Sequence, residues 1–207
     1  DSGWVERCLV ESASLSIGGK IPHEELARRE RMREVTQGVT AYSTDTEFTR
    51  ITYALDGELF MHNLPQRKGE AIGLPSPIET GGGCIDPRLS PDGSQVAFVH
   101  AESLFTVDTH SLKETRLCGP AEAEDNVFWG LADFAAAEEF DRVRGYWWAS
   151  DSRSLLVERV DETPVDVAWI PDPANPLTPA REHRYPFAGT PNANVSLHRV
   201  TLTGDIN

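Results

Sequence analysis

Apolar and polar positions alternate over short runs along most of this chain, a pattern typical of half-buried β-strands. Three segments share one arrangement, in which a strand, a polar turn centred on an aspartate and a second apolar strand follow one another. They are residues 50–61, 87–99 and 146–157. Asp-Gly between apolar runs, as at 56–57 and 92–93, is the strongest short-range signal for a β-hairpin. The third turn reads Ser150-Asp151-Ser152, so we expect it to be longer or altered.

The spacing of these hairpins predicts the fold class. The central residues Asp56, Asp92 and Asp151 are 36 and 59 positions apart. If residues 130–144 form an inserted helix of about 15 residues, the second interval falls to about 44, and a hairpin period of about 40 is typical of a β-propeller blade. We therefore predict a mainly β fold, a partial β-propeller of about three to four blades over residues 39–207. A β-sandwich with similar turns is the alternative.

An N-terminal segment, residues 1–38, precedes the strands. Its residues 22–35 predict a helix, because a proline and two acidic residues suit the first turn. We expect surface ion pairs at i,i+4 between Glu24 and Arg28 and between Glu25 and Arg29. Its apolar contacts would come from Leu26, Met32 and Val35.

Charge and cysteine content narrow the function classes. The net charge of −14 argues against a nucleic-acid partner, which needs a basic face, and is compatible with a cationic ligand. No apolar run approaches the roughly 18 residues that cross a membrane. The three cysteines form no CxxC pair, and the six histidines share no metal-ligand spacing, so we expect no metal and no cofactor. A reducing, cytoplasmic location is the simpler reading of the cysteines.

Residues 129–140 are rich in alanine and predict the inserted helix, which carries the adjacent carboxylates Glu138 and Glu139. On a continuous helix, Leu131, Phe134 and Glu138 fall within an arc of about 60°. This phase puts Glu138 on the buried stripe and points Glu139 away from it. Such a pair can hold a positive charge, and a solvated face is the ordinary alternative.

The segment 129–148 resembles the dipeptidyl peptidase IV family of serine peptidases, closest to its bacterial and cytosolic branches. The residues that carry the resemblance are Glu138-Glu139-Phe140-Asp141-Arg142 and Gly145-Tyr146-Trp147-Trp148. The likeness continues through residues 159–165, 172–176 and 185–197. It covers most of residues 22–200.

The resemblance implies a propeller, usually of eight blades, followed by an α/β-hydrolase domain. In the full-length protein, that domain would be the intramolecular partner of this propeller. It gives Glu138 and Glu139 the role of binding the free α-ammonium of a peptide substrate, so that dipeptides are released. Family members usually prefer proline or alanine as the second substrate residue. A partial propeller has unpaired blade faces, so we expect either oligomeric pairing, as in a homodimer, or that the chain is a piece of a larger ordered molecule.

The chain departs from the family pattern in one respect. No G-x-S-x-G nucleophile motif occurs in the 207 residues, so we expect the first propeller blades without the hydrolase domain, no catalytic residue, and no activity of this piece alone. The family's substrate-contacting arginine has no matched position, although Arg142 and Arg144 lie near the glutamates.

The alternatives are a non-enzymatic propeller that binds partners, and an unrelated acidic sandwich in which Glu138 is remote from any concave surface.

Overall fold

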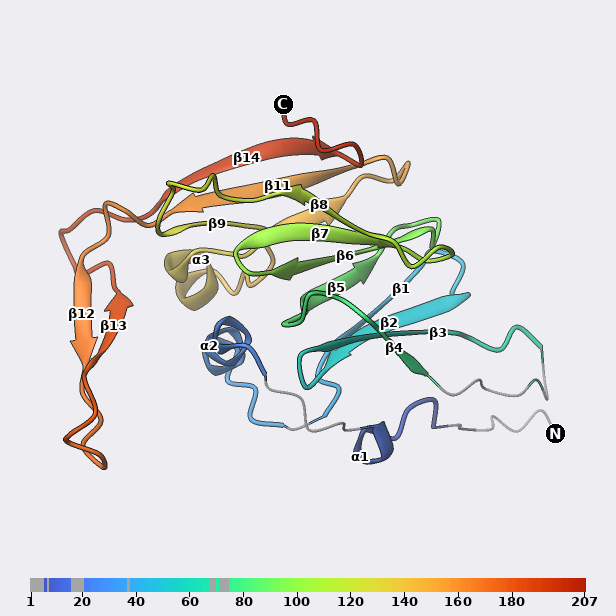
Figure 1. The fold of residues 1–207 in the computed structure, drawn as a ribbon, viewed down its shortest axis with the longest axis horizontal. Coiled ribbons are helices and arrows are strands. Elements are labelled where there is room, and N and C mark those ends of the chain that lie inside the picture. The colour runs from blue at the N-terminus through green and yellow to red at the C-terminus, as the bar shows by residue number, and fades with distance from the viewer. Residues whose placement is uncertain (1–5, 7, 16–20, 37, 68–69, 71–74) are drawn as a thin grey trace.

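The computed structural model describes residues 6, 8–15, 21–36, 38–67, 70 and 75–207, and it is built mostly of antiparallel β-strands (Figure 1). The predicted N-terminal segment is therefore described only in part, because residues 1–5, 7, 16–20 and 37 lie outside the described residues. Its described residues include two helices, α1 (Ser12–Leu15) and α2 (His23–Arg31). Among the described residues, no helix combines the length and the apolar character needed to cross a membrane.

Two complete blades follow, each a four-stranded meander in chain order. Blade 1 consists of β1 (Tyr42–Thr44), β2 (Arg50–Leu55), β3 (Glu58–Asn63) and β4 (Ser76–Ile78). Blade 2 consists of β5 (Ile85–Leu89), β6 (Gln95–His100), β7 (Ser103–Asp108) and β8 (Glu114–Cys118).

Blade 3 has an interrupted inner strand. Its strands are β9 (Val127–Trp129), β10 (Tyr146–Trp148), β11 (Ser154–Asp161) and β14 (Asn194–Thr201). Both β9 and β10 pair antiparallel with β11, β10 with residues 155–157 and β9 with residues 159–161. The two pieces therefore act as one strand, from which residues 130–145 leave and return. We call these residues the insertion; they contain helix α3 (Phe134–Glu139).

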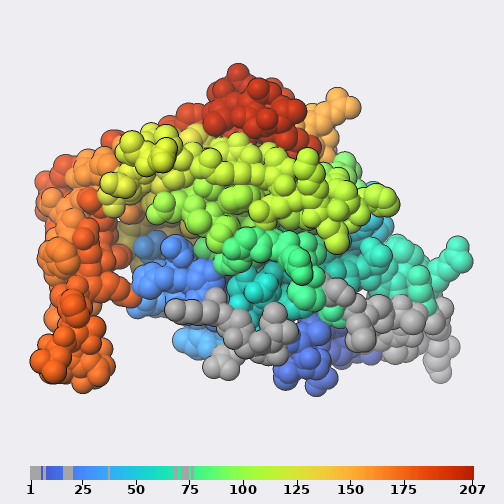
Figure 2. All heavy atoms as spheres, in the orientation of Figure 1, coloured from blue at the N-terminus to red at the C-terminus, as the bar shows by residue number. Residues whose placement is uncertain are grey.

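A second excursion leaves blade 3 between β11 and β14. It forms a separate two-stranded sheet of β12 (Val167–Ile170) and β13 (Arg181–Arg184), which we call the arm. The arm stands out from the body of the molecule, in orange at the left of the views (Figures 1 and 2). The partial propeller is thus confirmed, with the insertion and the arm as additions to blade 3.

The predicted hairpins form where the aspartates indicated. Asp56 and Gly57 both have positive φ, of 52° and 81°, as the two-residue type I′ turn between β2 and β3 requires. The turn at 90–95 is closed by the Ser90 N–H donating to the Gln95 carbonyl at 2.8 Å and the Gly93 N–H donating to the Ser90 carbonyl at 2.9 Å.

The expectation of a longer or altered third turn was wrong. The corresponding bonds, Ala149 N–H to Ser154 O and Ser152 N–H to Ala149 O, are 2.9 and 3.0 Å long, so the turn has the same length. Ser152 adopts a φ of 60° where blade 2 has glycine. Its hydroxyl accepts a hydrogen bond from the Asp92 N–H at 3.1 Å and so links the turns of blades 2 and 3.

Neighbouring blades are joined by an apolar core in which the aromatic strand β10 is central. Tyr146 is fully buried, and its hydroxyl lies within hydrogen-bond reach of the carbonyl oxygens of Asp86 and Ala97 in blade 2. The Trp148 indole N–H donates to the Arg88 carbonyl at 3.1 Å. The buried side chains around them come from both blades, among them Val99, Leu104, Trp129, Leu155 and Val200. Strand β10 therefore fixes blade 3 against blade 2.

Helix α2 is shorter than predicted and buries a different face. Its buried residues are Glu25 and Arg29, whereas Leu26 is 50% and Val35 94% exposed. Glu25 accepts hydrogen bonds from both Arg28 and Arg29 at 2.8 Å, so the expected pairing of Arg28 with Glu24 was wrong. Charged groups that satisfy one another allow this helix to lie against the propeller through a polar face.

The insertion leaves the sheet through a narrow neck made by Gly130 and Gly145. The Gly130 N–H donates to the Glu158 carbonyl at 2.9 Å, and the Glu158 N–H donates to the Gly145 carbonyl at 2.8 Å. Beyond the neck, Leu131 and Arg144 form a β-bridge. A Cβ on Gly145 would lie 2.4 Å from the Leu131 nitrogen, so only glycine permits the two strands of the neck to approach this closely.

We expect Gly145→Ala to lower the free energy of unfolding by about 1–3 kcal/mol, because the clash is with backbone that the sheet holds in place. Chemical denaturation measures this. The matched control is Gly81→Ala, whose Cβ would meet only the His100 ring at 3.4 Å and which should change stability by less than about 1 kcal/mol. Equal effects of the two substitutions would contradict a closed neck.

Candidate functional site

Helix α3 begins at Phe134 and ends at Glu139, so the predicted helix over 130–144 was too long. Asp133 is its N-cap, and its Oδ2 accepts hydrogen bonds from the N–H groups of Ala135 and Ala136 at 3.1 and 3.3 Å. The helix stops because Asp141 takes a φ of 51°, which turns the chain back toward the sheet. Leu131 and Ala132, between the neck and Asp133, are not helical, and Leu131 forms the β-bridge to Arg144.

The prediction that Glu138 shares a buried stripe was wrong for the same reason. Leu131 precedes the helix, so the helical phase that related it to Glu138 does not apply. Ala136 and Ala137 form the buried side of α3, and both Glu138 and Glu139 are exposed. The structure brings the two glutamates together at the C-terminal end of the helix.

The side chain of neither glutamate forms an ion pair or a hydrogen bond with any residue that the structure describes. The last turn of α3 holds no basic residue, and the free carbonyl groups of a helix C-terminus carry partial negative charge. Asp141 adds a third exposed carboxylate close by. This end of the insertion therefore presents uncompensated negative charge, suited to a cation from outside the described chain.

Of the two arginines near the glutamates, Arg142 is paired within the protein. Arg142 forms a fork with the carboxylate of Glu158, with an Nη2–Oε1 distance of 2.9 Å, and Asp133 lies 3.6 Å from the same guanidinium. The hydrogen bond from Arg142 opposes the rise that burial imposes on the pKa of Glu158, which remains above its ordinary value. Burial and the nearby Arg88 lower the pKa of Arg144.

Aromatic contacts hold the first turn of α3. The Phe134 ring lies 5.1 Å from the Tyr185 ring and 6.2 Å from the His183 ring, centroid to centroid, both on the arm side. The Arg31 guanidinium of α2 lies 5.3 Å from the Phe134 centroid, a cation–π distance. These contacts hold α3 between α2 and the arm.

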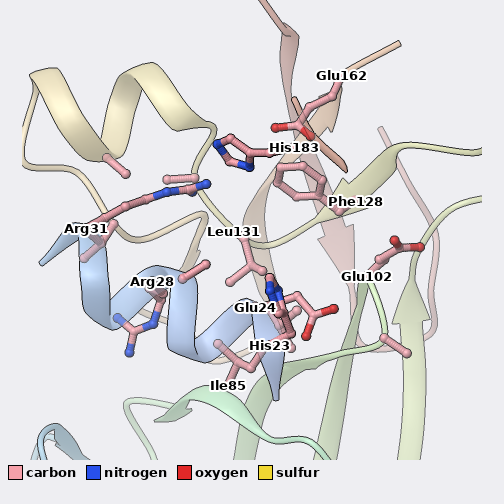
Figure 3. A pocket seen from close by; sticks show the side chains of 16 residues that line it. His23, Glu24, Arg28, Arg31, Ile85, Glu102, Phe128, Leu131, Glu162 and His183 are labelled. Carbon is pink, nitrogen blue, oxygen red and sulfur yellow. The ribbon is translucent and has the colours of Figure 1, made fainter. Parts of the chain in front are cut away.

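A cleft of ≈ 240 Å³ opens between α2, the insertion and blades 2 and 3 (Figure 3). Its apolar walls include Ile85, Val99, Phe128 and Leu131. Ala137 reaches it from the buried side of α3, so the helix that carries Glu138 does border a concave surface, unlike the arrangement expected of an unrelated sandwich.

The charged residues of the cleft did not stand out in the sequence. Figure 3 shows Arg31 extending from α2 toward His183 and Glu162, with Glu24 and Glu102 on the other side. Burial raises the pKa of Glu102, and the neighbouring carboxylates Glu24 and Asp125 add to the rise. Burial likewise raises the pKa of Glu162, while Arg31 and Arg184 oppose the rise. Among the described residues, no His, Cys, Asp and Glu cluster could hold a metal ion.

We expect Asp133→Ala to lower the free energy of unfolding by about 1 kcal/mol, because two N–H groups of α3 lose their acceptor. Asp133→Asn is the matched control, since asparagine also caps helices, and it should cost less than the alanine variant. Urea denaturation of both variants measures the difference. Equal losses would show that the carboxylate acts through Arg142 rather than as a cap.

Comparison with known proteins places this geometry in a family. The family model described as "Dipeptidyl peptidase IV (DPP IV) N-terminal region" matches residues 37–206. Human dipeptidyl peptidase 8 is 28% identical over 214 residues, covering 93% of this chain and 24% of the human protein, and the mouse protein of the same name is 27% identical over 227 residues. A probable dipeptidyl-aminopeptidase B of Trichophyton verrucosum is 29% identical over 123 residues, which cover 52% of this chain and 13% of that protein.

A crystal structure of Porphyromonas gingivalis dipeptidyl peptidase 4 superposes with a TM-score of 0.67 at 24% identity, over 86% of this chain and 26% of that chain, which shows a shared fold. The chain spans about a quarter of the length of the dipeptidyl peptidase 8 relatives. The family model covers most of the residues, including all three blades, the insertion and the arm. The chain therefore belongs to the family of dipeptidyl peptidase IV N-terminal regions.

Proposed function

We propose that this chain is the part of a dipeptidyl peptidase that binds the free amino terminus of a peptide substrate, and that Glu138 and Glu139 bind its α-ammonium. The observation that carries the proposal is the pair of exposed carboxylates without a partner among the described residues, at the end of a helix whose base is rigidly attached to the sheet. Family membership supports it, because the relatives are named dipeptidyl peptidases.

The chemistry suits the ligand. An α-ammonium offers three N–H donors, and two adjacent carboxylates can accept them as charge-assisted hydrogen bonds worth about 1.5–3 kcal/mol each. An N-acetylated peptide has no such charge and only one donor. A fixed position for the ammonium also sets how far along the substrate the cut falls, so the pair acts as a ruler for dipeptide release.

In this proposal the reaction itself is carried out elsewhere in the protein. These 207 residues contain no G-x-S-x-G motif, so an α/β-hydrolase domain outside them supplies the serine nucleophile and the pocket for the second substrate residue. A preference for proline or alanine at that residue, which the family resemblance implies, belongs to the same proposal. The propeller contributes the anchor and the hydrolase domain contributes the cut.

A cytoplasmic location is part of the same proposal. All three cysteines are free thiols, Cys84 and Cys118 buried and Cys8 exposed, which is typical of proteins in reducing compartments. That the protein forms a homodimer is likewise a prediction.

In the full-length protein, we expect Glu138→Gln with Glu139→Gln to lower kcat/KM for a fluorogenic Ala-Pro or Gly-Pro substrate by about 100-fold or more, because two charge-assisted bonds to the ammonium are weakened. Initial rates over a range of substrate concentrations measure this. Activity on the N-acetylated substrate should start low and should not fall further in the variant.

The matched control is Asp141→Asn, which removes the same charge from an exposed neighbour and suits its positive φ. We expect it to change kcat/KM by less than about threefold, because an exposed charge that does not contact the ligand is largely screened. Wild-type kcat/KM in the double glutamine variant, or an equal loss in Asp141→Asn, would contradict the assignment to Glu138 and Glu139.

A further inference from the structure

Glu158 lies where the insertion leaves the sheet. It sits in the middle of β11, opposite the gap between β9 and β10, and its backbone pairs with both neck residues, Gly130 and Gly145. Its side chain is only 1% exposed. A buried carboxylate is costly unless a cation and further hydrogen bonds satisfy it, so its partner is under strong constraint.

That partner is Arg142, three residues after Glu139 on the returning half of the insertion. Its guanidinium binds both carboxylate oxygens of Glu158, and its Nη1 also donates to the Arg144 carbonyl at 3.0 Å. A two-point fork fixes the direction as well as the distance of the guanidinium. The returning half of the insertion is thereby fixed to the central strand of blade 3.

Arg142 also contacts α3 at two points. Its backbone N–H donates to the carbonyl of Ala136, the third residue of the helix, at 3.0 Å. Its side chain lies 3.6 Å from Asp133, the residue that caps the first turn. One residue thus connects the N-cap of the helix, the helix backbone and the sheet beneath.

The same fork decides where the positive charge goes. Arg142 is close in sequence to three exposed carboxylates, Glu138, Glu139 and Asp141, and its guanidinium is nevertheless bound to Glu158 and directed toward Asp133. A guanidinium released from Glu158 could neutralise those carboxylates. By binding the Arg142 guanidinium, Glu158 therefore keeps it from pairing with Glu138 and Glu139.

We propose that Arg142 and Glu158 are positioning residues of the substrate anchor: the pair orients α3 and withholds its own cation from Glu138 and Glu139. This inference rests on the proposed function, since it concerns how the same glutamates are held. Neither residue contacts substrate in this scheme; both act through the glutamates.

The test is a double-mutant cycle in the full-length protein, with kcat/KM for the Ala-Pro or Gly-Pro substrate as the readout. Arg142→Met should lower kcat/KM about 10- to 100-fold, because a misplaced anchor loses much of its effect. In the Glu138→Gln/Glu139→Gln background the same substitution should cost less than about twofold more, because residues that act through one another are not additive. Activity on the N-acetylated substrate should not change.

A second variant separates positioning from stability. Arg142→Met alone leaves a buried carboxylate unpaired and can unfold the protein, whereas Arg142→Met with Glu158→Met replaces the pair by apolar side chains, which proteins often tolerate. We expect this double variant to keep a thermal midpoint close to that of the wild type and still to show the loss in kcat/KM. Arg142→Lys keeps the charge without the fork and should recover only part of the activity.

The matched control is the neighbouring ion pair of the same strand, Arg159 with Glu124, whose Nη2–Oε1 distance is 2.9 Å. Arg159→Met with Glu124→Gln should leave kcat/KM within about twofold, since this pair is part-exposed and neither residue belongs to the insertion.

Two outcomes would overturn the inference. One is full kcat/KM in the Arg142→Met/Glu158→Met protein, and the other is an Arg142→Met loss that persists undiminished in the glutamine background. If the glutamine variant itself keeps wild-type kcat/KM, the proposed function fails and this inference with it. A glutamine variant that loses activity while the Arg142 variants do not leaves the anchor in place and removes only the positioning role.

Discussion

The backbone of Glu158 is the point on which the arrangement of blade 3 depends. Its N–H and carbonyl groups close the gap in the inner strand by bonding to the two glycines of the neck. Its side chain, buried below the insertion, is balanced by a guanidinium that comes from the insertion itself. The backbone of Glu158 thus stabilises the point where the insertion leaves the sheet. Its side chain fixes the orientation of the insertion beyond that point.

Contacts between blades supply the rigidity that this arrangement needs. Tyr146 and Trp148, just after the neck, bond to carbonyl groups of blade 2, and Ser152 links the adjacent turns. The strand that receives the returning insertion is therefore among the most firmly held in the structure. A binding residue placed on an excursion from such a strand gains precision from the sheet without being buried in it.

Local patterns predicted the parts of the fold that local physics determines. Asp56-Gly57 required two left-handed residues in succession, and the turn formed there. The extent of α3 was missed although Asp133, directly before an alanine-rich run, is a recognisable N-cap signal. The assumed phase instead began at Leu131, which the sheet holds in a bridge to Arg144. Nothing near Ser152 in the sequence shows that its hydroxyl serves the next blade.

The remaining site features come from contacts between segments far apart in the chain. The cleft walls bring together residues separated by scores of positions. The fork on Glu158 joins residues 16 positions apart on different elements, and hydrophobic periodicity reports neither kind of contact. A charged residue within an apolar strand, as at Glu158, is a sequence signal that can indicate a buried ion pair. That its partner is Arg142 could be established only from the folded structure.

The in-line placement of β9 and β10 has a consequence for how this surface can change. Both pieces keep the register of one strand, so the insertion, the sixteen residues from Gly130 to Gly145, leaves and rejoins the sheet at the same place. Residues beyond the neck can be exchanged or lengthened while every cross-strand partner in the blade stays the same. The blade framework and the insertion are thus structurally separable: the blade determines where the insertion projects, and the residues beyond the neck determine which chemical groups are presented there.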